Sequence, residues 1–159
     1  SDTYLPRNST ALLDAIGETI ERMGKRLDQT PESDRPGKVI VAILTDGLEN
    51  ASTRFTWQDV AQKIRHQTEK YGWDFLFLGA NQDAIATAAN LSISRHNSAT
   101  YCSDQIGTRS SSKSLSRKAR GLRAAASGME FSTQRQKDAA APMSEIVAEE
   151  DGKERGKEN

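Results

Sequence analysis

The sequence predicts an α/β fold, in the form of a doubly wound, Rossmann-like and mostly parallel sheet flanked by helices. Two short runs, 39–44 and 73–79, are apolar at nearly every position, which is typical of strands covered on both faces. Segments with a helical apolar period lie before, between and after these runs. The connections are long enough for helical crossovers, so this fold fits better than an all-β or an all-helical one.

The first predicted helix begins near residue 12 and is amphipathic. Its apolar positions recur at steps of three and four residues, while charged residues occupy the opposite side. The apolar set is Leu12 or Leu13, Ile16, Ile20, Met23 and Leu27. The segment 28–37 holds prolines and glycine among polar residues, so we expect a surface loop before the strand at 39–44.

The second predicted helix opens with a capping box. Thr56 is the expected N-cap, Asp59 reaches back to it, and Gly72 ends the helix. The elements expected after it are a strand over 73–79, an alanine-rich helix over 83–91, a short strand over 99–102 and a last helix over 105–128.

Composition places the core in the first part of the chain. Hydrophobic residues make up 35% of the 159 residues, and the mean hydropathy is -0.70. Charged and small residues dominate after residue 128. We therefore expect one α/β domain over 1–128 and a charged, disordered tail over 129–159.

The overall charge is balanced, with 22 Lys and Arg residues against 22 Asp and Glu residues. The chain therefore has no long-range attraction to nucleic acid or to an anionic membrane. No apolar segment is long enough to cross a bilayer. The single cysteine, Cys102, excludes an intramolecular disulfide and fits a reducing compartment, so we expect a cytoplasmic protein.

Two polar residues stand where chemistry is expected in such a fold. Asp46 follows the apolar run 39–44 and precedes a glycine, at the end of a strand where open α/β sheets keep their sites. Thr10 lies just before the first helix. Each residue also has a purely structural interpretation. Thr10 or Ser9 would cap the helix, and Asp46 would bond its own backbone in a turn where Gly47 takes a positive φ.

Together, the segments around Thr10 and Asp46 resemble the second half of a von Willebrand factor A domain, and the likeness spans about residues 4–123. The resemblance implies a metal-ion-dependent adhesion site that binds Mg²⁺, or Mn²⁺ in its place. Thr10 would be a hydroxyl ligand, Asp46 would hold the ion through water, and Gly47 would let the loop approach. Asn50 matches a loop position of the family. The ion would bind an acidic side chain of a protein partner, so the implied function is binding and not catalysis.

The sequence departs from this family at one essential point. The Asp-x-Ser-x-Ser segment that supplies the other ligands is absent, and Ser110–Ser114 does not replace it because it follows no apolar strand. Two such ligands alone would bind Mg²⁺ weakly or not at all. The strand at 39–44 would also keep an unpaired apolar edge, so we expect a fragment of a longer protein or a chain unstable alone. That the chain starts with Ser1 fits the first option.

Other functions remain open at this stage. The alternative to a binding module is a metal-dependent α/β hydrolase or phosphotransferase that uses Asp46. A purely structural role for Thr10 and Asp46 is the third. The basic residues over 109–123 could contact phosphate, but without aromatic residues among them a solvated helix face is the preferred interpretation, and nucleic acid is not an expected partner. His66 and His96 lack a second ligand at zinc spacing.

Overall fold

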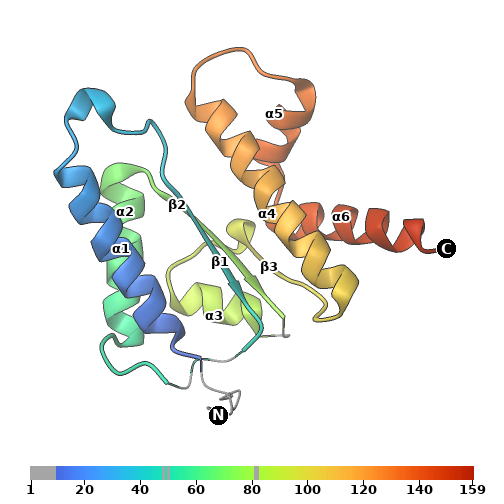
Figure 1. The fold of residues 1–159 in the computed structure, drawn as a ribbon, viewed down its shortest axis with the longest axis horizontal. Coiled ribbons are helices and arrows are strands. Elements are labelled where there is room, and N and C mark those ends of the chain that lie inside the picture. The colour runs from blue at the N-terminus through green and yellow to red at the C-terminus, as the bar shows by residue number, and fades with distance from the viewer. Residues whose placement is uncertain (1–9, 48, 50, 81–82) are drawn as a thin grey trace, which may run out of the picture.

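The computed structural model describes residues 10–47, 49, 51–80 and 83–159, and it has the predicted α/β architecture (Figure 1). Its elements are, in chain order, α1 (Leu12–Asp28), the 3₁₀ turn η1 (Glu32–Asp34), β1 (Ile40–Thr45), α2 (Trp57–Tyr71), β2 (Asp74–Gly79), α3 (Ala84–Asn90), the 3₁₀ turn η2 (Arg95–Asn97), β3 (Ser98–Thr100), α4 (Gln105–Ala126), α5 (Thr133–Ala140) and α6 (Met143–Lys157).

The described strands form one parallel sheet in the order β1-β2-β3. The register pairs Ile40 with Asp74 and Thr45 with Gly79, and Gly79 in turn pairs with Thr100. All three strands therefore end at the same side of the sheet, called the carboxyl edge below. This is the edge at which the sequence predicts the functional site.

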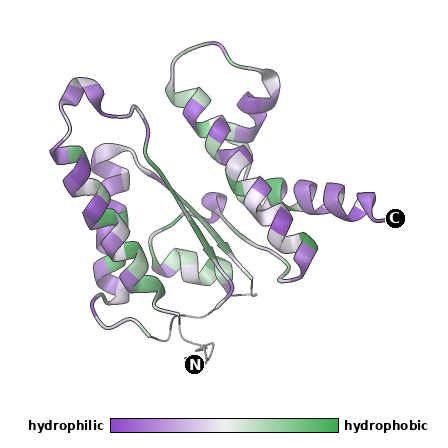
Figure 2. Cartoon of the chain, in the orientation of Figure 1, coloured by the Kyte–Doolittle hydropathy of each residue, from purple (hydrophilic) through white to green (hydrophobic). Residues whose placement is uncertain are grey.

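Helices cover both faces of the sheet, as predicted. On one face α1, α2 and α3 pack against the strands through residues that include Ile16, Ile64 and Phe77. On the other face α4 and α6 cover β2 and β3, where Leu76 and Leu78 are fully buried. The strands are the most evenly hydrophobic elements in Figure 2, as expected for a sheet with a core on each face.

The predicted helix boundaries at α2 are confirmed in detail. The Thr56 hydroxyl accepts a hydrogen bond from the Asp59 amide, and the Asp59 carboxylate accepts one from the Thr56 amide. Gly72 ends the helix with a left-handed φ of 65°. The third strand is one residue shorter than predicted. It begins at Ser98 and ends at Thr100, so Tyr101 and Cys102 lie beyond it.

The prediction of a disordered tail over 129–159 is contradicted. This segment folds into α5 and α6, which pack against α4 (Figure 1). Met143 and Ile146 are fully buried and Val147 is nearly so. These three apolar residues recur at helical spacing and fix one face of α6, although acidic and basic residues surround them in the sequence.

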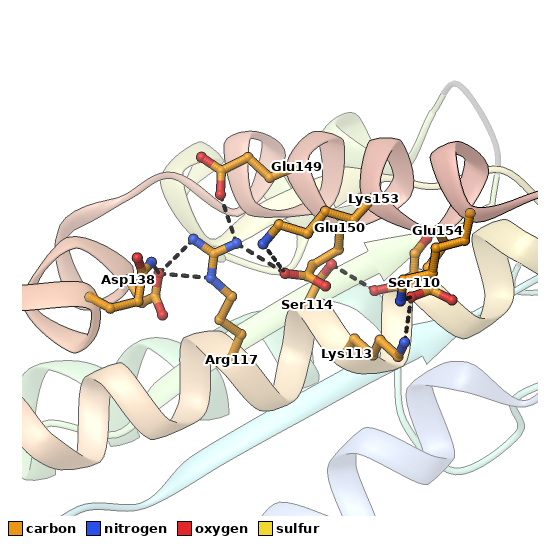
Figure 3. A network of polar contacts seen from close by, with 11 residues as sticks. Ser110, Lys113, Ser114, Arg117, Asp138, Glu149, Glu150, Lys153 and Glu154 are labelled. Atoms are coloured by element: carbon orange, nitrogen blue, oxygen red, sulfur yellow. Dashed lines mark hydrogen bonds and ion pairs between the residues drawn. The ribbon is translucent and has the colours of Figure 1, made fainter. Parts of the chain in front are cut away.

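Ion pairs join α4 to α5 and α6, as Figure 3 shows. The Arg117 guanidinium lies 2.7 Å from both Asp138 and Glu149 and 3.1 Å from Glu150. Glu154 pairs with Lys113 and Lys157. The basic residues Arg109, Lys113, Arg120 and Arg123 are exposed, as predicted for a solvated helix face, whereas Arg117 lies largely within the ion pairs of the chain.

A buried lysine makes the second polar connection of α4 to α5. Lys118 is 0% exposed, and its ammonium donates to the backbone oxygens of Ala139 and Ala141, at 2.8 and 2.6 Å. These two carbonyls lie where α5 ends and need a donor from outside the helix. Burial lowers the pKa of Lys118, and the charges of Asp74 and Asp138 oppose this shift.

Truncation of the Met143 side chain tests whether α6 is a packed helix. We expect Met143→Ala to lower the free energy of unfolding by about 2–5 kcal/mol, because the side chain is fully buried against the sheet. Chemical denaturation measures the loss. The control is Ser144→Ala at the exposed neighbouring position, for which we expect a change of about 0.5 kcal/mol or less. Equal effects would contradict the packing of α6.

The Glu154 ion pairs predict a pH-dependent stability. Lys113 and Lys157 lower the pKa of Glu154 from its ordinary 4.5 to about 2, so the folded state favours the ionised form. The resulting stabilisation is present above about pH 4.5 and is lost as the pH falls toward about 2. Urea midpoints of wild type and Glu154→Gln should therefore differ near neutral pH and converge in acid. Glu145→Gln, on the exposed side of α6, is the control. A difference that does not change with pH would refute this assignment.

Candidate metal site at the carboxyl edge of the sheet

Asp46 lies in a tight turn directly after β1. The turn is closed by the buried Thr45, whose hydroxyl donates to the Gly47 carbonyl at 2.9 Å and accepts from the Gly47 amide at 3.3 Å. In the structural interpretation Asp46 closes this turn with its own side chain. The structure shows that the Thr45 hydroxyl makes these hydrogen bonds instead. The Asp46 side chain is exposed at the carboxyl edge.

Thr10 lies against this turn. A Cβ atom placed on Gly47 would come within 2.6 Å of the Thr10 hydroxyl oxygen, closer than a real Cβ contact allows. Gly47 is therefore needed for close approach. It does not take the positive φ expected in the structural interpretation, since the described glycines with positive φ are Gly72 and Gly128. The structure thus brings together the segment around Thr10 and the segment around Asp46.

Thr10 does not cap α1. The N-cap residue is Ala11, which makes no side-chain cap bond. The first helical amides instead donate to the loop that follows β1, with Leu13 N at 2.8 Å from Glu49 Oε2 and Asp14 N at 3.0 Å from Ser52 Oγ. Ser9, the other proposed cap, and Asn50, the predicted loop residue, lie outside the described residues.

Glu49 organises this loop, a role that no pattern in the sequence indicates. Besides the Leu13 amide, it accepts hydrogen bonds from the amides of Ala51 and Ser52 and from the Ser52 hydroxyl. Burial raises the pKa of Glu49, but the hydrogen bonds from Leu13 and Ser52 outweigh this effect, so the pKa falls below its ordinary value. Both carboxylate oxygens are occupied, which makes Glu49 a structural anchor.

Asp14 anchors the next part of the same loop from α1. Its carboxylate accepts hydrogen bonds from the amides of Thr53, Arg54 and Phe55, at 2.9 to 3.0 Å. The Thr53 amide makes the largest contribution to a lowered pKa of Asp14. Both carboxylates are therefore held ionised, and they tie the start of α1 to the chain between β1 and α2.

Tyr101 follows β3, at the opposite edge of the sheet from β1, and its side chain extends to the end of β1. Its hydroxyl donates to the Thr45 carbonyl at 3.5 Å. Burial raises the pKa of Tyr101, and the negative charge of Asp46 raises it further. The Tyr101 phenol therefore interacts electrostatically with the Asp46 carboxylate. Tyr101 falls within the strand predicted over 99–102, and the sequence indicates no role for it, because only the sheet order brings it to β1.

A pocket of about 210 Å³ opens beside the turn, between the carboxyl edge and the helices that pack there. Leu12, Trp57 and Phe77 supply apolar walls, and Thr45 and Thr87 supply hydroxyl groups. It offers space for a side chain next to Thr45 and Gly47.

The candidate metal ligands near this turn are few. Among the described residues, no group of three or more His, Cys, Asp or Glu side chains could hold a metal ion. Ser110 and Ser114 are buried in α4, and their hydroxyls bond to backbone carbonyls of that helix. Thr10 and Asp46 remain the residues that oxygen-ligand chemistry favours here.

Comparison of the chain with protein-family models, with curated proteins and with solved structures finds no match. The described helices include none with the length and apolar character that crossing a membrane requires.

Removal of the Glu49 carboxylate should loosen the site without touching Thr10 or Asp46. We expect Glu49→Ala to lower the free energy of unfolding by about 1–3 kcal/mol, because it leaves the amides of Leu13, Ala51 and Ser52 without their acceptor. Thermal or urea unfolding measures this. Glu69→Ala, at an exposed position of α2, is the matched control. Equal stability of the two variants would contradict the anchoring role.

Proposed function

We propose that the chain is a protein-binding module of the von Willebrand factor A type, whose carboxyl edge takes part in a Mg²⁺-dependent adhesion site. Thr10 would supply a hydroxyl ligand, and Asp46 would hold the ion through water. The site would bind an acidic side chain of a protein partner. We propose no catalytic activity, and we place the protein in the cytoplasm.

The observation that carries the proposal is the contact between Thr10 and the turn after Asp46. The Thr10 hydroxyl lies against Gly47, the residue that follows Asp46, at the end of a parallel strand. Such oxygen ligands suit a hard cation like Mg²⁺, which keeps water where protein ligands are few. Mn²⁺ accepts the same ligands. Neither Thr10 as a helix cap nor Gly47 as a positive-φ turn residue accounts for this contact.

The charges around the site also support a bridging ion. Asp46 is exposed, while Glu49 is occupied by four hydrogen bonds and does not add a second carboxylate for the ion. An ion held mainly by hydroxyl and water oxygens keeps enough positive charge to attract one further carboxylate. The partner would supply it, and the pocket beside Gly47 has room for a neighbouring apolar side chain.

A titration with Mn²⁺, followed by water-proton relaxation or calorimetry, tests the proposal. We expect weak binding, because two protein ligands leave most of the coordination to water. Asp46→Ala should abolish it and leave the fold intact, since Asp46 is exposed. Asp34→Ala removes an exposed carboxylate from η1, outside the proposed site, and should bind as wild type does.

Two outcomes would overturn the proposal. Asp46→Ala that binds Mn²⁺ as well as Asp34→Ala does would remove Asp46 from the site. Metal-dependent turnover of a phosphate ester that is lost in Asp46→Ala would instead favour the alternative, a hydrolase or phosphotransferase.

A further inference from the structure

A pocket of about 360 Å³ lies at the edge of the sheet where the strands begin, opposite the carboxyl edge. We call it the amino-edge pocket. Val39 and Trp73, which directly precede β1 and β2, line it together with the last turns of α1 and α2. These two helices lie side by side on one face of the sheet (Figure 1). The volume falls in the range of small-ligand sites.

Apolar and aromatic side chains form one part of the amino-edge pocket. Trp73 is 4% exposed and stacks on Phe75 with the ring centroids 6.2 Å apart, so the core holds its ring in place. Tyr71 meets the ring of His66 edge to face at 5.8 Å. Leu27 lines the pocket from α1 and packs against the same core. A ligand would therefore meet rings that the fold has already ordered, at little cost in entropy.

Two opposite charges line the same pocket. Asp28 and Arg35 do so, and neither forms an ion pair with any residue that the structure describes. Arg35 Nε donates to the Thr30 carbonyl at 2.9 Å, which holds the guanidinium just beyond the end of α1. Asp28 is the last residue of that helix, where the helix dipole disfavours a negative charge. A cation next to Asp28 would therefore be stabilised.

The ammonium of Lys38 also lies at this edge, but the protein itself uses it. It is 2.7 Å from the Asp74 carboxylate and 2.7 Å from the Gly72 carbonyl. Its charge is thus neutralised within the chain. One acid and one base, Asp28 and Arg35, remain for a ligand.

We propose that the amino-edge pocket binds a free α-amino acid with an apolar side chain. The ammonium of the ligand pairs with Asp28, its carboxylate pairs with Arg35, and its side chain contacts Trp73 and Leu27. A zwitterion satisfies both charges of the pocket. A simple anion would leave Asp28 without a partner and a simple cation would leave Arg35 without one, so neither matches the pocket as well.

This inference goes beyond the proposed function, and all measurements are made in EDTA, so that failure of the metal site does not affect them. Trp57→Phe leaves Trp73 as the single tryptophan and a reporter in the pocket. Titration with L-phenylalanine or L-leucine should then change the Trp73 fluorescence to saturation. Glycine should bind about tenfold more weakly or worse, because it buries no apolar side chain.

Substitution of each charge tests the assignment. Asp28→Asn and Arg35→Gln should each weaken L-phenylalanine binding by about tenfold or more, because each removes a charge-assisted contact. Asp34→Asn and Arg22→Gln, at exposed positions that do not line the pocket, are the matched controls and should bind as wild type does. Circular dichroism checks that all four variants fold.

Two analogues separate the charges further. L-Phenylalaninamide keeps the ammonium but not the carboxylate, so Asp28→Asn should weaken its binding and Arg35→Gln should not. N-Acetyl-L-phenylalanine keeps only the carboxylate, so the two variants should have the reverse effects. Both analogues should bind the wild-type chain more weakly than L-phenylalanine does.

Three results would overturn the proposal. The first is the absence of a saturable change with both L-phenylalanine and L-leucine. The second is L-phenylalanine binding to Asp28→Asn and Arg35→Gln that is as tight as binding to the control variants. The third is wild-type binding of N-acetyl-L-phenylalanine as tight as that of L-phenylalanine, which would indicate a carboxylate site without a role for Asp28.

Discussion

The first half of this structure depends on one constraint: the amide groups in the first turn of α1 need hydrogen-bond acceptors from outside the helix. Here α1 has no side-chain cap of its own, and the loop after β1 satisfies its amides through Glu49 and Ser52. Asp14 returns the interaction by accepting three amides of the same loop. This reciprocal bonding fixes α1 to the end of β1, sets Thr10 against Gly47 and positions the capping box of α2.

The second half is held by burial and charge together. Met143 and Ile146 bury α6, while Arg117 and Glu154 each pair with more than one opposite charge. Half-buried ion pairs are screened less than exposed ones, and each partner would be costly to leave unpaired. The zero net charge of the chain therefore reflects, in part, positive and negative groups that neutralise one another across α4, α5 and α6.

Local patterns were sufficient for the elements that build the sheet. The apolar runs at β1 and β2 and the period of α1 record burial directly, and the capping box of α2 is a contact within four residues. The folding of the segment 129–159 depends on a distant surface. Met143 packs against α4 and the sheet, and its neighbours in the sequence do not indicate this contact. At the site, Thr10 and Asp46 could be named from the segments that they begin and end. Glu49 and Tyr101 act through partners far along the chain, so only the fold shows their place.

Lys118 has a consequence for how the helical layer moves. Its amine is fully enclosed and holds the carbonyls where α5 ends. An electrophile in solution reaches it only in molecules in which this enclosure has opened. Burial also lowers the pKa of Lys118, so the amine carries its proton less firmly than a surface lysine does. Comparing the rate of acylation at this nitrogen with the rate of global unfolding would therefore show whether α5 opens separately from the sheet.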